Sequence, residues 1–235
     1  MEDLVAAKVH LGHHRTLWHP KIQPYLFGVR DDTHIFDLEQ TMAHLRRALD
    51  VVRRVAHAGG IILFIGNRPQ FEKVIRHTAI QCGEYYVTKK YKPGSLTNSV
   101  QTLGAEIKPD LMIFITLPVS KVALRESYYS VIPSLGIVDS DQDPTQVTYS
   151  IPGNDDNIES VELYCKLLKR AVQEGKLYRK QGMDMGDFAV DVHDEVQKLK
   201  TMSQKSKVHL DYPEEFVEIE EMVLKKAARD RDGLE

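Results

Sequence analysis

Residues 133–165 read P-S-L-G-I-V-D-S-D-Q-D-P-T-Q-V-T-Y-S-I-P-G-N-D-D-N-I-E-S-V-E-L-Y-C, and this stretch contains the clearest sign of alternating strands and helices in the chain. The apolar run Leu135–Val138 predicts a strand, and Val147–Ile151 predicts a second extended segment after an acidic turn. Pro152 cannot donate to a strand ladder and Gly153 permits a sharp turn, so the second strand is expected to end there. The stretch therefore predicts a strand, a loop, a second strand and a capped helix.

The polar residues of this corner suit either ligand binding or local capping. Residues 139–143, D-S-D-Q-D, resemble the first half of a calcium-binding loop. Such a loop needs glycine at its sixth position and glutamate at its twelfth, where this chain has Pro144 and Ser150. An acidic turn that accepts backbone amides is the favoured interpretation, and a magnesium ion shared with RNA phosphates stays open. A helix is expected from about residue 156 to 180, with its first amides capped by Asn154, Asp155 or Asp156.

Short apolar runs alternate with helical patterns along the rest of residues 1–180. Residues 61–65 and 111–115 are continuous apolar runs, which are typical of strands buried on both faces of a parallel sheet. Apolar residues recur at three- and four-residue steps through residues 37–57, which predicts an amphipathic helix. Further elements are expected at 69–82 (helix), 85–88 (strand), 97–98 (start of a short helix) and 120–131 (helix). This alternation predicts an α/β fold, a doubly wound layer structure with a mostly parallel sheet.

The chain is long enough for one α/β domain with an appendage. It has 235 residues, of which 42% are hydrophobic and 28% charged, as in ordinary globular domains. Residues 181–235 hold 8 Lys and Arg against 14 Asp and Glu, which leaves 23 against 20 in residues 1–180. We therefore expect a mildly basic body, 1–180, and an acidic C-terminal extension, 181–235, made of a linker and a helix. The apolar stripe of that helix is expected to bind a protein partner, and it consists of Phe216, Ile219 and Val223.

The sequence predicts neither a membrane-spanning helix nor a secretion signal. No run approaches the roughly 18 apolar residues that a spanning helix requires. Residues 1–13 lack the basic region and apolar segment of a signal peptide, and they are not rich in Arg and Ser like a transit peptide. Either no such peptide is needed or a longer precursor has been trimmed. Cys82 and Cys165 are expected to be buried free thiols within helices.

Signatures of catalysis are absent from the sequence. It has neither the G-x-G-x-x-G dinucleotide fingerprint nor the P-loop pattern, and the turn after residues 61–65 reads G-N-R-P. No G-x-S-x-G elbow is present, and His10, His13, His14 and His19 match no zinc-site spacing. We therefore expect no catalytic residue, no metal site, no cofactor and no small-molecule substrate. Two alternatives stay open: a nucleotide- or small-molecule-binding α/β enzyme, and a free adaptor protein that uses the C-terminal helix.

Basic and aromatic residues gather in segments that are expected to be loops. After a helix at residues 3–11, residues 12–30 are expected to form a long ordered loop that leads into a short strand at 25–27. This loop holds Arg15, Trp18, Lys21 and Arg30, a second loop holds K-K-Y-K at 89–92, and Asn67-Arg68 follows a strand. Cations contact phosphates and aromatic rings stack on unpaired bases, so these segments predict local RNA binding. The plain alternative is a solvated surface, with Trp18 packed in the interior.

Seven motifs then occur in a characteristic order: V-H-L-G-H (9–13), W-H-P-K-I-Q-P-Y-L-F-G (18–28), H-I-F-D-L-E-Q-T (34–41), G-I-I-L-F-I-G (60–66), L-T-N (96–98), G-I-V-D-S-D-Q-D-P (136–144) and I-P-G-N-D-D (151–156). As an ordered set they resemble the S-two family of small-subunit ribosomal proteins over about residues 3–180. The resemblance implies a flavodoxin-like or Rossmann-like α/β/α sandwich with a structural role. The partners that it implies are small-subunit rRNA and neighbouring small-subunit ribosomal proteins, with no membrane.

The connection after the L-T-N motif is similar to that of mitochondrial members. Bacterial members carry a helical insertion there, whereas Leu103-Gly104 leads here almost directly to Lys108. The resemblance therefore implies a place in the mitochondrion, in the small subunit of the mitoribosome. The residues that we assign to rRNA contact are His13, His14, Arg15, Trp18, Lys21 and Arg30, together with Arg68, Lys89, Lys90, Lys92 and Asn98.

Overall fold

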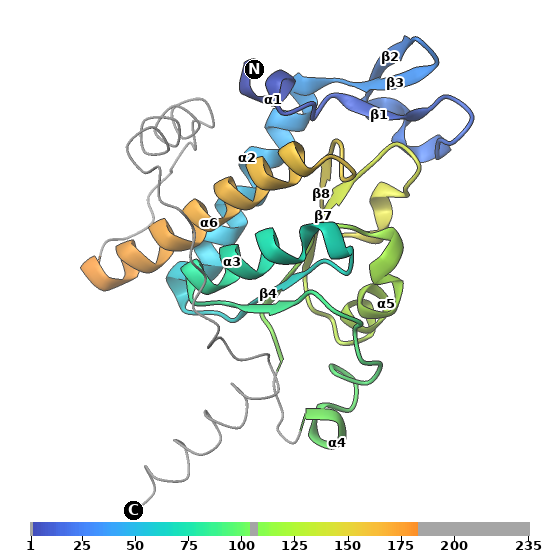
Figure 1. Ribbon diagram of the computed structural model, residues 1–235. Helices are drawn as coiled ribbons and strands as arrows, with labels where there is room; N and C mark the ends of the chain where they lie inside the picture. Colours follow the sequence, from blue (N-terminus) through green and yellow to red (C-terminus); the bar gives the residue numbers. More distant parts are fainter. Residues whose placement is uncertain (1, 104–107, 183–235) are drawn as a thin grey trace, which may run out of the picture.

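A five-stranded parallel sheet forms the centre of the molecule (Figure 1). The computed structural model describes residues 2–103 and 108–182. The strand order is β5-β4-β6-β7-β8, which is the order of flavodoxin-like folds. The strands are β4 (Ile62–Ile65), β5 (Tyr85–Val87), β6 (Leu111–Phe114), β7 (Ser134–Val138) and β8 (Tyr149–Pro152). The predicted α/β fold with a parallel sheet is therefore confirmed.

Helices cover both faces of this sheet because successive strand residues point to opposite sides. Ile62 and Phe64 belong to one hydrophobic core, whereas Leu63 and Ile65 belong to a second core on the other face. The first core is covered by α2 (Leu38–Ala58), α3 (Glu72–Cys82) and α6 (Ile158–Gln181). The second is covered by α5 (Lys121–Tyr129) and by the segment 91–96. Short elements complete the fold: α1 (Glu2–Ala6), α4 (Ser99–Leu103), and the 3-10 helices η1 (Pro20–Tyr25), η2 (Pro69–Phe71), η3 (Pro118–Ser120) and η4 (Pro144–Gln146).

The long helices α2 and α6 approach each other closely at Gly175. A Cβ at this position would lie 2.4 Å from the carbonyl oxygen of Arg53 and 2.8 Å from the Cβ of Ala56. Arg53 is itself buried, and its guanidinium lies 3.0 Å from the Glu174 carboxylate. Glycine at position 175 therefore allows the two helix backbones to pack without a side chain between them.

An antiparallel sheet in the order β1-β3-β2 lies beside the carboxyl ends of β7 and β8 (Figure 1). Its strands are β1 (Leu11–His14), β2 (Leu26–Arg30) and β3 (Thr33–Phe36). The strand expected at 25–27 corresponds to β2, but the prediction of a loop is wrong for β1 and η1, and the first helix ends at Ala6 instead of residue 11. The sequence G-H-H carries no apolar alternation, so β1 gives no strand pattern. β1 contacts the parallel sheet through a polar link, since the His13 N–H donates to the Ser140 hydroxyl at 2.7 Å, whereas Phe36 of β3 packs in the second hydrophobic core.

Two further expectations concern burial and the C-terminal extension. Cys82 and Cys165 are buried free thiols, as predicted. The predicted C-terminal helix, including Phe216, Ile219 and Val223, and the predicted linker beyond Gly182 lie outside the described residues. None of the helices in the described ranges has the combination of length and apolar character that crossing a membrane requires.

Candidate functional site

His13 joins the antiparallel sheet to the parallel sheet through two carboxylates. Its Nδ1 lies 3.0 Å from Oδ1 of Asp139, just after β7, and its Nε2 lies 3.1 Å from Oδ2 of Asp156, after β8. The hydrogen bond to Asp139 outweighs partial burial and raises the pKa of His13 to about 9. The imidazole is therefore protonated at neutral pH and forms an ion pair with each carboxylate.

Asp155 is the most enclosed carboxylate of this cluster. Gln142 donates its Nε2–H to Asp155 Oδ2 at 2.9 Å, and the Asp155 N–H donates to Oδ2 of the buried Asp139 at 3.3 Å. Burial, followed by repulsion from Asp139, raises the pKa of Asp155 to about 7. This side chain is therefore balanced between its neutral and charged forms near physiological pH.

Arg68 brings a second cation to the same carboxylates. It follows β4 and pairs with Asp156, and its guanidinium lies 3.9 Å from Oδ1 of Asp155. Oxygen atoms of Asp139, Asp155 and Asp156 all lie within 4.8 Å of one another, and His13, Asp139 and Asp141 form a second group of that kind. Such oxygen ligands suit a divalent cation. In this structure His13 and Arg68 supply the positive charge that balances the carboxylates.

The turn after β8 corrects the predicted helix cap. Asn157 caps α6, because its side chain accepts the N–H of Glu159 at 3.3 Å. The prediction named Asn154, Asp155 or Asp156, and none of these holds the cap position. Asn154 Oδ1 instead accepts the N–H groups of Asp156 and Asn157 in the turn before the helix. Asp155 and Asp156 are thereby placed in the charged cluster and not at the helix start.

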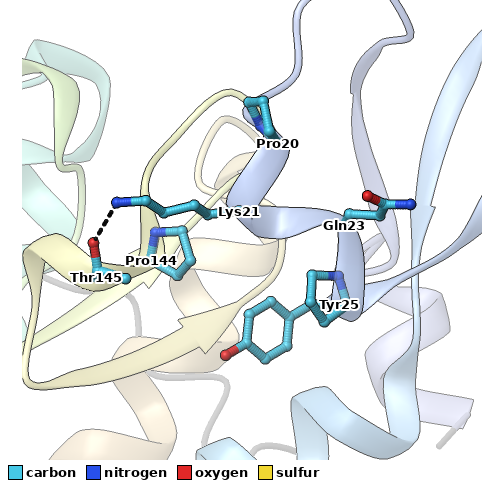
Figure 2. Close-up of a pocket in the computed structure, with 7 residues that line it drawn as sticks. Pro20, Lys21, Gln23, Tyr25, Pro144 and Thr145 are labelled. Atoms are coloured by element: carbon cyan, nitrogen blue, oxygen red, sulfur yellow. Dashed lines mark hydrogen bonds between the residues drawn. The ribbon is translucent and has the colours of Figure 1, made fainter.

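Lys21 ties η1 to the acidic turn that follows β7 (Figure 2). Its Nζ lies 2.7 Å from Oδ2 of Asp143 and 3.1 Å from the Thr145 hydroxyl, beside a hollow of about 640 Å³ that Tyr25 also lines. Although slight burial opposes it, the hydrogen bond from Lys21 lowers the pKa of Asp143 to about 2. Asp143 also accepts a hydrogen bond from the Thr145 N–H at 2.9 Å. The acidic turn thus accepts a backbone amide, as predicted.

Several of the residues assigned to rRNA lie exposed on or next to the antiparallel sheet. Arg15 Nε lies 3.1 Å from Asp32 and Arg30 Nε lies 3.6 Å from Asp31, and His14 is exposed as well. Exposed ion pairs of this kind contribute only about 0 to 1 kcal/mol. Trp18 is 39% exposed, with its ring centroid 5.7 Å from that of His34. Trp18 is therefore not the buried packing residue of the plain alternative.

A second exposed group lies on the segment after β5. Lys89, Lys90 and Lys92 are exposed, whereas the intervening Tyr91 is buried. The Tyr91 hydroxyl donates to the Glu126 carboxylate of α5 at 2.9 Å, and so the ring anchors the segment. The expectation of an aromatic surface in this loop is therefore wrong.

The structure does not bring all of the assigned residues together. Asn98 lies directly before α4, which Figure 1 places at the opposite end of the molecule from β1, β2 and β3. His13, Lys21 and Arg68 contact carboxylates of this chain. Sequence reasoning missed the roles of Asp139, Gln142 and Asp155. The sequence does contain a signal for this cluster, because Asp139 and Asp155 follow neighbouring parallel strands, and residues at such positions meet at one edge of the sheet.

Comparisons with known proteins agree on one family. The family model described as ribosomal protein S2 matches residues 4–108 and 101–175. A small ribosomal subunit protein uS2m of Bos taurus is 42% identical over 77% of this chain and 64% of the relative. A uS2m of Neurospora crassa is 34% identical over 79% of this chain and 49% of its own length, and a uS2 of Gluconobacter oxydans is 36% identical over 74% and 82%. The chain thus spans about half of one uS2m relative and about two thirds of the other.

Proposed function

This chain belongs to the ribosomal protein S2 family, and from that premise we propose that it is a structural component of a small ribosomal subunit. The observation that carries the proposal is the family match over residues 4–108 and 101–175. The family and its relatives are named as subunit proteins and not as enzymes, which supports a non-catalytic role. The parallel sheet then serves as a scaffold that presents loops to other subunit components.

The proposed location is the mitochondrion. Support comes from the relatives of Bos taurus and Neurospora crassa, whose printed names mark them as uS2m. The short connection between Leu103 and Lys108, where bacterial members have a helical insertion, supports the same placement. The two segments of the family match also meet at residues 101–108.

We place the proposed rRNA contact on two exposed groups of side chains. Phosphates attract cations and unpaired bases stack on aromatic rings, and each group supplies cations that point to solvent. The groups are His14, Arg15, Trp18 and Arg30 next to the antiparallel sheet, and Lys89, Lys90 and Lys92 after β5. The carboxylates that pair with Arg15 and Arg30 are themselves exposed. Because His13, Lys21 and Arg68 instead pair with carboxylates that are buried or only partly exposed, we assign them to positioning these surfaces. Asn98 is a separate candidate contact beside α4.

The acidic extension is proposed to contact a neighbouring subunit protein. Residues 181–235 hold 14 acidic against 8 basic residues, and RNA phosphates repel such a segment. Phe216, Ile219 and Val223 would supply the apolar side of this contact. Crosslinks from the extension that run mainly to rRNA would contradict this part of the proposal.

Sedimentation of the native chain tests the proposed function. A tagged full-length chain is expected to co-migrate with small-subunit rRNA in sucrose gradients of mitochondrial extract. It should leave that fraction when ribonuclease digests the rRNA. A free adaptor would stay at the top of the gradient in both cases. A nucleotide-binding enzyme would instead show thermal stabilisation by nucleotides, and no such stabilisation is expected.

A further inference from the structure

Helix α5 exposes an aromatic and basic surface that packing of the fold does not use. Tyr128 and Tyr129 are 81% and 74% exposed, and their rings meet edge to face with centroids 5.9 Å apart. Val122, Arg125 and Tyr129 follow one another at three- and four-residue steps, so they share one side of the helix. This α5 surface consists of Lys121, Val122, Arg125, Tyr128, Tyr129 and, just beyond the helix, Val131.

Val131 belongs to this surface at a cost to the stability of the chain. Its φ of 55° lies in the left-handed region, which strains a β-branched residue, and its side chain is 88% exposed. The Ile132 N–H donates to the Ser127 carbonyl at 2.9 Å and the Val131 N–H to the Tyr128 carbonyl at 3.2 Å, which is the Schellman pattern that favours glycine. Helices α2, α3 and α6 end at a left-handed glycine, namely Gly59, Gly83 and Gly182. A valine that is 88% exposed gains too little packing free energy to compensate for the backbone strain. Its presence therefore points to contact with another molecule.

The α5 surface borders a hollow that it shares with α4. The hollow has a volume of about 540 Å³, and Val100 and Tyr129 line it together with polar residues that include Asn98. Val100 is itself an exposed large apolar residue. Tyr129 and Val100 thus border one hollow, so a partner that covers the end of α5 also reaches α4.

The charge of the α5 surface indicates the chemistry of what covers it. Lys121 and Arg125 are exposed, whereas Glu126, the only acidic residue of α5, points inward. The Glu126 carboxylate accepts the Tyr91 hydroxyl at 2.9 Å and the Gly94 N–H at 2.6 Å. The outer side of the helix is thus positive and without a carboxylate of its own. A complementary partner presents apolar side chains together with Asp or Glu.

We propose that the α5 surface docks a neighbouring protein that presents apolar side chains flanked by carboxylates. Tyrosine and arginine supply much of the binding free energy at protein interfaces, and both are present here. An RNA surface explains the cations and the tyrosines but gives no reason for exposed Val100, Val122 and Val131. The inference rests on the proposed function, in which this neighbour is another small-subunit protein.

Site-specific photo-crosslinking of the full chain tests the proposal. A photo-crosslinking phenylalanine analogue replaces Tyr128, with a control analogue at Leu177, an exposed residue of α6. The expected result is one protein adduct from position 128 and not from position 177, whose mapped peptide is apolar and acidic. Arg125→Glu in the same chain should reduce the adduct at least fivefold. An adduct with rRNA, an adduct with a second copy of this chain, or no adduct would overturn the proposal.

Val131→Gly separates docking from folding. Glycine relieves the left-handed strain, so the melting temperature of the isolated chain should rise, while loss of the side chain should lower the adduct yield at position 128. A higher melting temperature with undiminished crosslinking would contradict the proposal.

The adduct is measured in whichever gradient fraction holds the chain. Co-migration with small-subunit rRNA without a protein adduct overturns the docking alone, whereas a protein adduct on chain at the top of the gradient overturns the ribosomal role alone.

Discussion

Nδ1 of His13 lies 3.0 Å from Oδ1 of Asp139, and this ion pair holds β1 against the carboxyl end of β7. Asp139 is buried, so its charge would be costly without a cation beside it. The Ser140 hydroxyl adds a hydrogen bond from the His13 N–H at 2.7 Å. The antiparallel sheet is therefore attached at this point by polar contacts whose strength depends on protonation.

We predict that the stability supplied by His13 is lost at high pH. Its pKa is about 9 in the folded chain, above the ordinary value of 6.5, so folding favours the protonated form. The stabilisation is fully present below pH 6.5 and is lost as the pH rises through 9. His13→Gln should lower the unfolding free energy by about 2 kcal/mol at pH 6 and by much less at pH 10. Urea unfolding at both pH values measures this, with the exposed His14→Gln as control, and a difference that is the same at both would contradict it.

Asp155 is predicted to destabilise the chain at neutral and alkaline pH. Burial and repulsion from Asp139 raise its pKa to about 7 from 3.8, so the unfolded chain ionises first and stability falls as the pH rises from 3.8 to 7. Asp155→Asn keeps an acceptor for Gln142 and removes the repulsion. It should raise the unfolding free energy by about 1 to 2 kcal/mol at pH 8 and change it little at pH 4. Asp156→Asn is the matched control and should lower stability, because Asp156 pairs with His13 and Arg68. Thermal melts at both pH values decide between these outcomes.

The parallel sheet was predictable from local sequence, whereas the antiparallel sheet was not. Ile62–Ile65 and Leu111–Phe114 are apolar at every position because both faces of the sheet are covered, and such a pattern is visible without a structure. β1 reads L-G-H-H, and its pairing with β3 depends on residues distant in sequence. A prediction based on periodicity therefore assigns these residues to a loop.

The charged cluster shows a similar limit. The sequence around Asp139 and Asp155 indicated turns, and turns are present. What the sequence did not reveal is that the chain returns His13 and Arg68 to the same edge. The residues assigned to RNA by charge alone therefore fall into two groups: exposed cations, and cations that pair with enclosed carboxylates of the chain. Only the topology, which shows which residues meet in space, separates the two groups.

Gly175→Ala is predicted to destabilise the chain although alanine is the better helix former. Intrinsic propensity favours alanine by about 1 kcal/mol in a helix interior. The added Cβ would lie 2.4 Å from the carbonyl oxygen of Arg53, and this backbone atom moves only if α2 shifts. We expect a net loss of about 2 kcal/mol in unfolding free energy, measured by urea denaturation. Leu177→Ala, an exposed change on the same helix, is the control with little expected effect. A Gly175→Ala chain at least as stable as the parent would show that the helices do not pack this closely.

Removal of exposed cations is predicted to weaken rRNA binding and to flatten its salt dependence. Each phosphate contact contributes about 0.7 to 0.9 to the slope of log K against log salt concentration. Arg15→Ala, Lys89→Ala and Lys90→Ala combined should therefore lower the slope by about 2 if most of these side chains contact phosphate. Filter binding of the full chain to small-subunit rRNA between low and moderate salt measures the slope.

Lys21→Ala tests whether a cation held by a partly enclosed carboxylate contributes as much to RNA binding as cations on the open surface. Its Nζ lies 2.7 Å from Oδ2 of the partly enclosed Asp143, whose pKa it lowers to about 2, whereas Arg15 pairs at 3.1 Å with the exposed Asp32. Added to the three exposed substitutions, Lys21→Ala should therefore change the salt slope least of the four. Lys166→Ala, an exposed substitution on α6, is a control that should leave the slope unchanged. If the triple substitution left the slope unchanged, neither group of side chains would contact RNA phosphates. A slope that falls most on loss of Lys21 would mean that the Asp143 pair opens when RNA binds.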